Sequence, residues 1–72
     1  MKFSADVWTE TLEIDETGYV TKSKLVYIVL VGIHADNKQE AINKVELTVS
    51  NYCENILKSV YQILEIDCRR IH

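Results

Sequence analysis

Proline is absent from this chain of 72 residues, and glycine occurs only twice. Disordered sequences are usually rich in proline, glycine and charge, whereas this one is 47% hydrophobic and 26% charged. We therefore expect a single folded domain over residues 1–72. A domain of this size buries only about 60–65% of the surface of its unfolded chain, so its core is thin.

Cysteine and positive charge are also scarce. The two cysteines, Cys53 and Cys68, are too few for a disulfide framework and form no CxxC motif, which favours packed thiols in a reducing compartment over a single disulfide between helix and sheet. The formal net charge of -3 disfavours direct binding to nucleic acid. The N-terminal stretch MKFSADVW lacks a signal-peptide run, and no apolar run is long enough for a bilayer span. We expect a cytoplasmic protein that does not bind membranes.

The sequence contains no catalytic signature. It has no GxSxG or HExxH motif and no glycine-rich phosphate loop. His34 ends a predicted strand and His72 ends the chain, and neither is a convincing base or ligand. So small a domain also offers little cavity for two carboxylates with separated pKa values. We therefore expect no enzyme, no cofactor and no metal site.

Two strands joined by a turn are predicted in the first half of the chain. Residues 2–14 alternate in hydrophobicity, and a change of parity near Trp8 suggests either a bulge or a strand whose two faces are unevenly exposed to solvent. The following DETG segment, Asp15 to Gly18, favours a β-hairpin into a second strand over residues 19–34. Gly32, near the end of that strand, indicates a further bulge or a close backbone approach.

A long helix is predicted next. Asp36 with Gln39, and Asn37 with Glu40, both fit a capping box at its start. A helix of about 22 residues spans roughly 33 Å, which is enough to cover one sheet face. Leu47 falls on the polar side, either as an ordinary exposed residue or as an anchor for a partner. The apolar stripe consists of Ile42, Val45, Val49, Tyr52, Cys53, Ile56 and Val60.

The last segment, YQILEIDCRRIH, alternates from Ile63, with Leu64, Ile66 and Cys68 on the predicted buried side. The predicted fold class is α+β, in ββαβ order, with a three-stranded, mainly antiparallel sheet that carries one long helix on one face. The third strand pairs with the first, in the order 2-1-3, or with the second, in the order 1-2-3. We prefer 2-1-3 because antiparallel pairs are commoner.

The run KLVYIVLVGIH, residues 24–34, is apolar at both parities. One helix covers only one face of a sheet, so half of this strand has no cover within the chain. The outward set is either Tyr27, Val29 and Val31 or Val26, Ile28 and Leu30. An uncovered apolar strand indicates association with another protein or with a second copy of the chain.

Seven residues are candidates for contact with a partner. Acidic residues of the first hairpin can dock on a basic groove, and aromatic residues dominate binding hot spots. Trp8 is equally compatible with a place in the core. Two further carboxylates lie on the exposed side of the third strand. The candidates are Asp6, Trp8, Glu10, Glu13, Tyr27, Glu65 and Asp67.

The closing string LEIDCRR, Leu64 to Arg70, is similar to the end of the Dmd-type antitoxins. With its ββαβ order, the chain resembles small phage-encoded inhibitors, which include those antitoxins, phage inhibitors of host RNA polymerase and anti-CRISPR proteins. The resemblance implies a stoichiometric blocker that docks on a host or defence protein, in the host cytoplasm if the chain is phage-encoded. The alternative is a structural subunit that forms a homodimer and so covers its own apolar sheet face.

Overall fold

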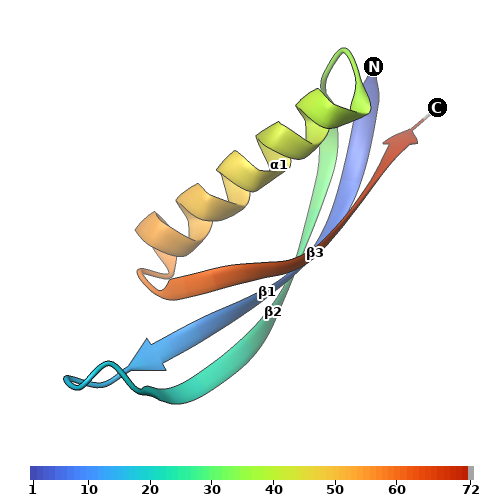
Figure 1. Ribbon diagram of the computed structural model, residues 1–72. Coiled ribbons are helices and arrows are strands. Elements are labelled where there is room, and N and C mark those ends of the chain that lie inside the picture. The colour runs from blue at the N-terminus through green and yellow to red at the C-terminus, as the bar shows by residue number, and fades with distance from the viewer. Residues whose placement is uncertain (72) are drawn as a thin grey trace.

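A computed structural model describes residues 1–71 of the chain, and His72 lies outside the described residues. The strands form one antiparallel sheet in the order β2-β1-β3. Figure 1 shows helix α1 lying along one side of this sheet, with no helix or strand of residues 1–71 on the other side. The predicted α+β class, ββαβ order and 2-1-3 arrangement are confirmed. The elements are β1 (Lys2–Ile14), β2 (Val20–His34), α1 (Lys38–Asn51), a π-helical turn (Tyr52–Ile56) and β3 (Val60–Ile71).

The turn between β1 and β2 is organised by Asp15. Its Oδ1 atom accepts hydrogen bonds from the backbone N–H groups of Thr17 at 2.9 Å and Tyr19 at 3.0 Å, and from the Thr17 hydroxyl at 2.7 Å. Gly18 has a φ of +90°, a conformation that is strained for residues with a Cβ atom. The turn predicted from the DETG segment is therefore confirmed.

The core lies between α1 and the side of the sheet that faces it. Its side chains are mostly small, since valines, a threonine and Cys53 are the largest that are fully buried. The hydroxyl of the buried Thr9 donates to the carbonyl of Val26 at 2.9 Å, so it has a partner. Both cysteines are free and buried, as packed thiols. The buried set is Phe3, Ala5, Val7, Thr9, Ala35, Ala41, Val45, Val49, Cys53 and Cys68.

Shifts in the strand register change which side chains face the helix. Gly32, with a φ of +74°, lies where the pairing of β1 with β2 shifts between Phe3 and Ala5. A second shift, in the pairing of β1 with β3, lies opposite Trp8 and Thr9 and leaves Leu64 unpaired. Leu64 is 49% exposed, so its predicted place beside Ile66 and Cys68 on the buried side is wrong. The extra residue reverses the alternation of β3 at that point.

The helix begins as predicted but ends early. The side chain of Asn37 caps α1 by accepting from the N–H of Glu40 at 2.8 Å. From Tyr52 onward the backbone hydrogen bonds join residues five apart instead of four. An example is the bond from the Leu57 N–H to the Tyr52 carbonyl at 3.0 Å. Each residue then turns the chain by less than 100°, and the apolar stripe loses its phase. Ile56 is consequently 66% exposed, and the predicted 22-residue α-helix is too long.

The structure also assigns the two faces of β2. Val26, Ile28 and Leu30 are partly buried on the side of α1, and Ile28 and Leu30 pack against the core. The residues between them have exposed side chains on the opposite side. Of the two sets that the sequence allows, the outward one is therefore Tyr27, Val29 and Val31.

Candidate functional site

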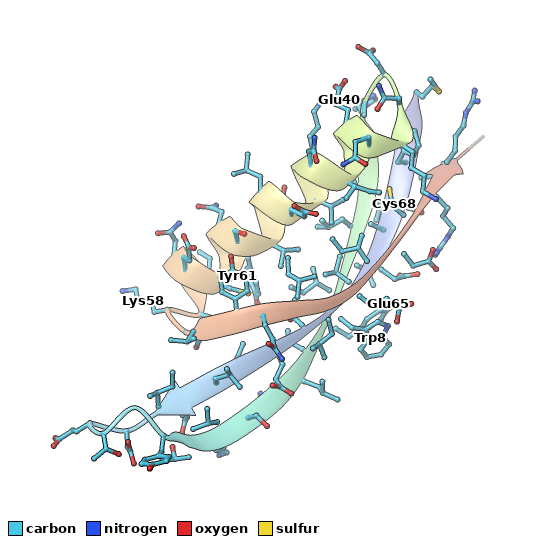
Figure 2. The ribbon with its side chains drawn as sticks, viewed as in Figure 1. Trp8, Glu40, Lys58, Tyr61, Glu65 and Cys68 are labelled. Carbon is cyan, nitrogen blue, oxygen red and sulfur yellow. The ribbon has the colours of Figure 1, made fainter. Side chains whose placement is uncertain are left out.

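The side of the sheet away from α1, here called the open face, carries both polar and apolar side chains from all three strands. Figure 2 shows Trp8 and Glu65 projecting together from this side, whereas Tyr61 and Cys68 point toward the helix. Residues that are paired across the strands point to the same side of the sheet, so the strand register identifies the other side chains of this face. Around the middle of the sheet the open face carries Asp6, Trp8, Glu10, Leu25, Tyr27, Val29, Val31, Leu64, Glu65, Asp67 and Arg69.

Trp8 and Tyr27 form an aromatic pair at the centre of the open face. They are directly opposite each other in the β1–β2 ladder, and their rings stack with centroids 4.4 Å apart and planes 25° from parallel. Trp8 remains 42% exposed and Tyr27 50% exposed. Trp8 is thus not the large core residue that the sequence also allowed. The stack fixes two large rings in place while leaving much of their surface open to a partner.

Asp6 connects this aromatic pair to β3. Its Oδ1 accepts from the Tyr27 hydroxyl at 2.7 Å, and its Oδ2 accepts from Nη2 of Arg69, also at 2.7 Å. Arg69 also donates through Nη1 to Oδ2 of Asp67 at 3.1 Å. The hydrogen bond from Tyr27, and after it the bond from Arg69, lowers the pKa of the Asp6 carboxyl. The same bond to Asp6 raises the pKa of the Tyr27 hydroxyl.

Apolar side chains flank the aromatic pair. Leu25, Val29 and Val31 continue along β2 and are each more than half exposed. A shallow depression extends from Leu25 of β2 past Trp8 to Leu64 and Glu65 of β3. An apolar patch that is contiguous and rimmed by polar groups is typical of an interaction surface.

Six of the seven residues predicted for partner contact lie together on the open face. Glu10 accepts a long hydrogen bond from Nε2 of Gln62 at 3.4 Å, and Glu65 lies opposite Trp8 in the ladder. Glu13 is the exception, because its register with Lys22 places it on the side of the sheet that carries α1. The acidic residues of the hairpin therefore do not form one surface.

Sequence reasoning did not single out Arg69 or Leu64 for this face. Arg69 shares the parity of Glu65 and Asp67, so the alternation of β3 contains the signal for it. No comparable signal exists for Leu64, because its position depends on the bulge. Leu25, beside Leu64, belongs to the apolar run of β2. The sequence alone does not show that Leu25 is exposed, because it does not show which side of β2 faces α1.

Residues 1–71 contain no group of three or more histidine, cysteine or acidic side chains arranged to hold a metal ion. His34 lies at the end of β2. His72 is outside the described residues. Burial raises the pKa of the Cys53 thiol, which disfavours the reactive thiolate. Over the same residues, no helix combines the length and the apolar character needed to cross a membrane.

No protein-family model, no curated protein and no solved structure matches this chain. The geometry of the open face is therefore the basis for the functional proposal.

Proposed function

We propose that this chain is a non-enzymatic protein-binding module that docks through its open face and inhibits a host or defence protein by stoichiometric occupancy. The observation that carries the proposal is the Trp8–Tyr27 stack held by Asp6 on the one sheet face that α1 does not cover. This mode of action agrees with the phage-inhibitor resemblance of the sequence.

The restrained conformations of these side chains favour binding. Tryptophan, tyrosine and arginine are the commonest hot-spot residues, and all three occur here within one connected cluster. Their conformations are already restrained by stacking and by charge-assisted hydrogen bonds. A partner would therefore gain contact area without the entropic cost of ordering these rings.

The charges of the open face indicate the chemistry of the partner surface. Glu65 and Asp67 lie on β3, Glu10 of β1 accepts a hydrogen bond from Gln62 of β3, and Arg69 is engaged with Asp6 and Asp67. The apolar residues of β2 lie on the other side of the pair. The matching surface is apolar where it meets β2 and basic where it meets β3.

The test compares Trp8→Ala with Leu47→Ala, a change of an exposed residue of α1 away from the open face. The protein captured by the wild-type chain from its native cell is purified, and its affinity and stoichiometry for each variant are measured by titration calorimetry. We expect a 1:1 complex that Trp8→Ala weakens by about 30-fold or more and Leu47→Ala leaves unchanged. Equal affinity of the Trp8 variant overturns the proposal, as does chemical turnover of the captured protein by the chain.

The charged rim has its own test. Glu65→Gln is expected to slow association, with an effect that fades as salt is raised, because rim charges act mainly on the rate of encounter. Glu13→Gln is the matched control, since Glu13 lies on the opposite side of the sheet. If both changes slow association equally, net charge rather than the open face governs docking.

A further inference from the structure

A second surface of the molecule, the free edge of β2, carries an inference that is independent of the open face. We propose that two copies of the chain pair antiparallel along this edge, about a two-fold axis at Ile28, and so form one continuous six-stranded sheet. Each copy then keeps its own open face for a partner. The inference does not rest on the function proposed above.

The hydrogen-bonding groups of the edge point outward at alternate residues. The hydroxyl of Thr9 donates to the carbonyl of Val26 at 2.9 Å, and the hydroxyl of Thr11 donates to that of Lys24 at 3.4 Å. These two carbonyls of β2 therefore face β1. In an antiparallel ladder the next residues direct their N–H and C=O groups the other way. The backbones of Leu25, Tyr27 and Val29 therefore present donors and acceptors to a further strand.

The two edges of the sheet differ in how they resist pairing. From Leu25 to Val31, β2 has seven consecutive residues without charge, proline or glycine. The β3 edge carries Glu65, Asp67 and Arg69 and is interrupted by the bulge at Leu64. Charges and bulges are the usual protection of a free edge, and an uncharged apolar strand lacks that protection. The β2 edge is therefore the one suited to pairing.

A second copy of β2 fits this edge better than an arbitrary strand. Antiparallel pairing centred on Ile28 places the uncharged run against itself, with Tyr27 opposite Val29 of the second copy, and opposed residues point to the same side. It also keeps the lysines of the two copies at opposite ends. Lys22 and Lys24 of one chain then lie toward the end of the other at which Asp36 follows β2. Parallel pairing would instead bring the lysines together.

The structure also provides space for the side chains of the added strand. A groove of about 400 Å³ runs between the β2 edge and α1. Its walls are mainly apolar on the strand, and they include a hydroxyl from α1 and an aromatic ring from the π-helical turn. The inward residues Val26, Ile28 and Leu30 of a second copy would lie beside it. The groove is lined by Val26, Tyr27, Ile28, Val29, Leu30, Thr48, Val49 and Tyr52.

The test uses two variants of one residue whose amide faces the free edge. Val29→Pro removes the outward N–H but no bond of the β1–β2 ladder, and Val29→Ala removes side-chain volume but keeps the N–H. Sedimentation equilibrium should give twice the mass of one chain for the wild type and for Val29→Ala. It should give the monomer mass for Val29→Pro, with dimerisation weakened on the order of 100-fold. A wild-type chain that stays monomeric up to about 1 mM overturns the proposal, since that concentration corresponds to negligible affinity.

Hydrogen exchange on the wild type tests the same point and does not depend on the folding of a variant. Protection of the Tyr27 and Val29 amides should rise with protein concentration, whereas the Ile66 amide, at the free edge of β3, should not change. Concentration-independent exchange at Tyr27 and Val29 overturns the inference. Trp8→Ala should leave the dimer mass unchanged, which separates failure of this inference from failure of the proposed open-face function.

Discussion

The hydroxyl of Tyr27 donates a hydrogen bond of 2.7 Å to Asp6, and Arg69 binds the second oxygen of the same carboxylate. One carboxylate on the central strand thereby links both edge strands across the open face. Because the Tyr27 ring also stacks on Trp8, the polar link fixes the position of the aromatic pair. The open face is thus organised by hydrogen bonds at its surface rather than by burial.

The first prediction concerns the pH dependence of this link. The folded-state pKa of Asp6 is lowered by Tyr27 and then by Arg69, so it lies below the value of about 3.9 expected in the unfolded chain. The stability that Asp6 contributes is therefore fully present above pH ~3.9 and is lost as the pH falls through the lower folded-state pKa. Carboxyl-carbon NMR titration should show this lowered midpoint, and Tyr27→Phe should raise it.

Tyr19→Phe is the matched control for that titration, because Tyr19 is 74% exposed in the turn region and does not contact Asp6. Removal of the Tyr19 hydroxyl should leave the titration midpoint of Asp6 at its wild-type value. A Tyr27→Phe chain with an unshifted Asp6 midpoint would show that the hydrogen bond is not maintained in solution.

The order of elements could be predicted because local signals agree with the tertiary structure. Asp15 with Gly18 specifies the hairpin turn, and Asn37 specifies the start of α1. The preference for antiparallel pairing then gives the correct strand order. These features depend on a few neighbouring residues, and the sequence contains them directly.

The missed features depend on backbone irregularities that have no strong residue signal. The bulge at Leu64 reverses the face of that side chain, and the π-helical turn after Asn51 shifts the apolar stripe so that Ile56 becomes exposed. The outward face of β2 could not be chosen either, because both of its parities are apolar. Only the position of α1 distinguishes them.

The second prediction concerns the core. Val45 is fully buried where α1 meets the sheet, so Val45→Ala should destabilise the fold by about 2–3 kcal/mol through lost burial and a residual cavity. In a domain of this size that loss lowers the thermal midpoint by roughly 10–20 °C, as measured by circular dichroism. Leu47→Ala, on the same helix at a position that is 72% exposed, should change stability by less than about 0.5 kcal/mol.

The third prediction concerns Lys58, which joins the helical segment to β3 with a φ of +52°. A side chain with a Cβ atom is strained in this left-handed conformation, and glycine is not. Lys58→Gly should therefore stabilise the fold by about 0.5–1 kcal/mol in urea denaturation, despite the greater entropy of the unfolded chain. Lys58→Ala removes the charge but keeps the Cβ atom, so a similar gain in that variant would assign the effect to charge instead.

The fourth prediction concerns the hairpin turn. The Asp15 carboxylate accepts from the Thr17 hydroxyl and from two backbone N–H groups, and these bonds, led by the one from the Thr17 side chain, lower the pKa of Asp15. Asp15→Ala should reduce the thermal midpoint at pH 7, whereas Glu16→Ala, the adjacent acidic change, should not. Since the folded-state pKa of Asp15 is depressed, its contribution is present above about pH 3.9 and disappears as the pH falls through the lower value. Thermal melts from pH 7 to pH 2 should therefore show the midpoints of the wild type and Asp15→Ala converging, and a difference that persists at pH 2 would assign the effect to lost packing.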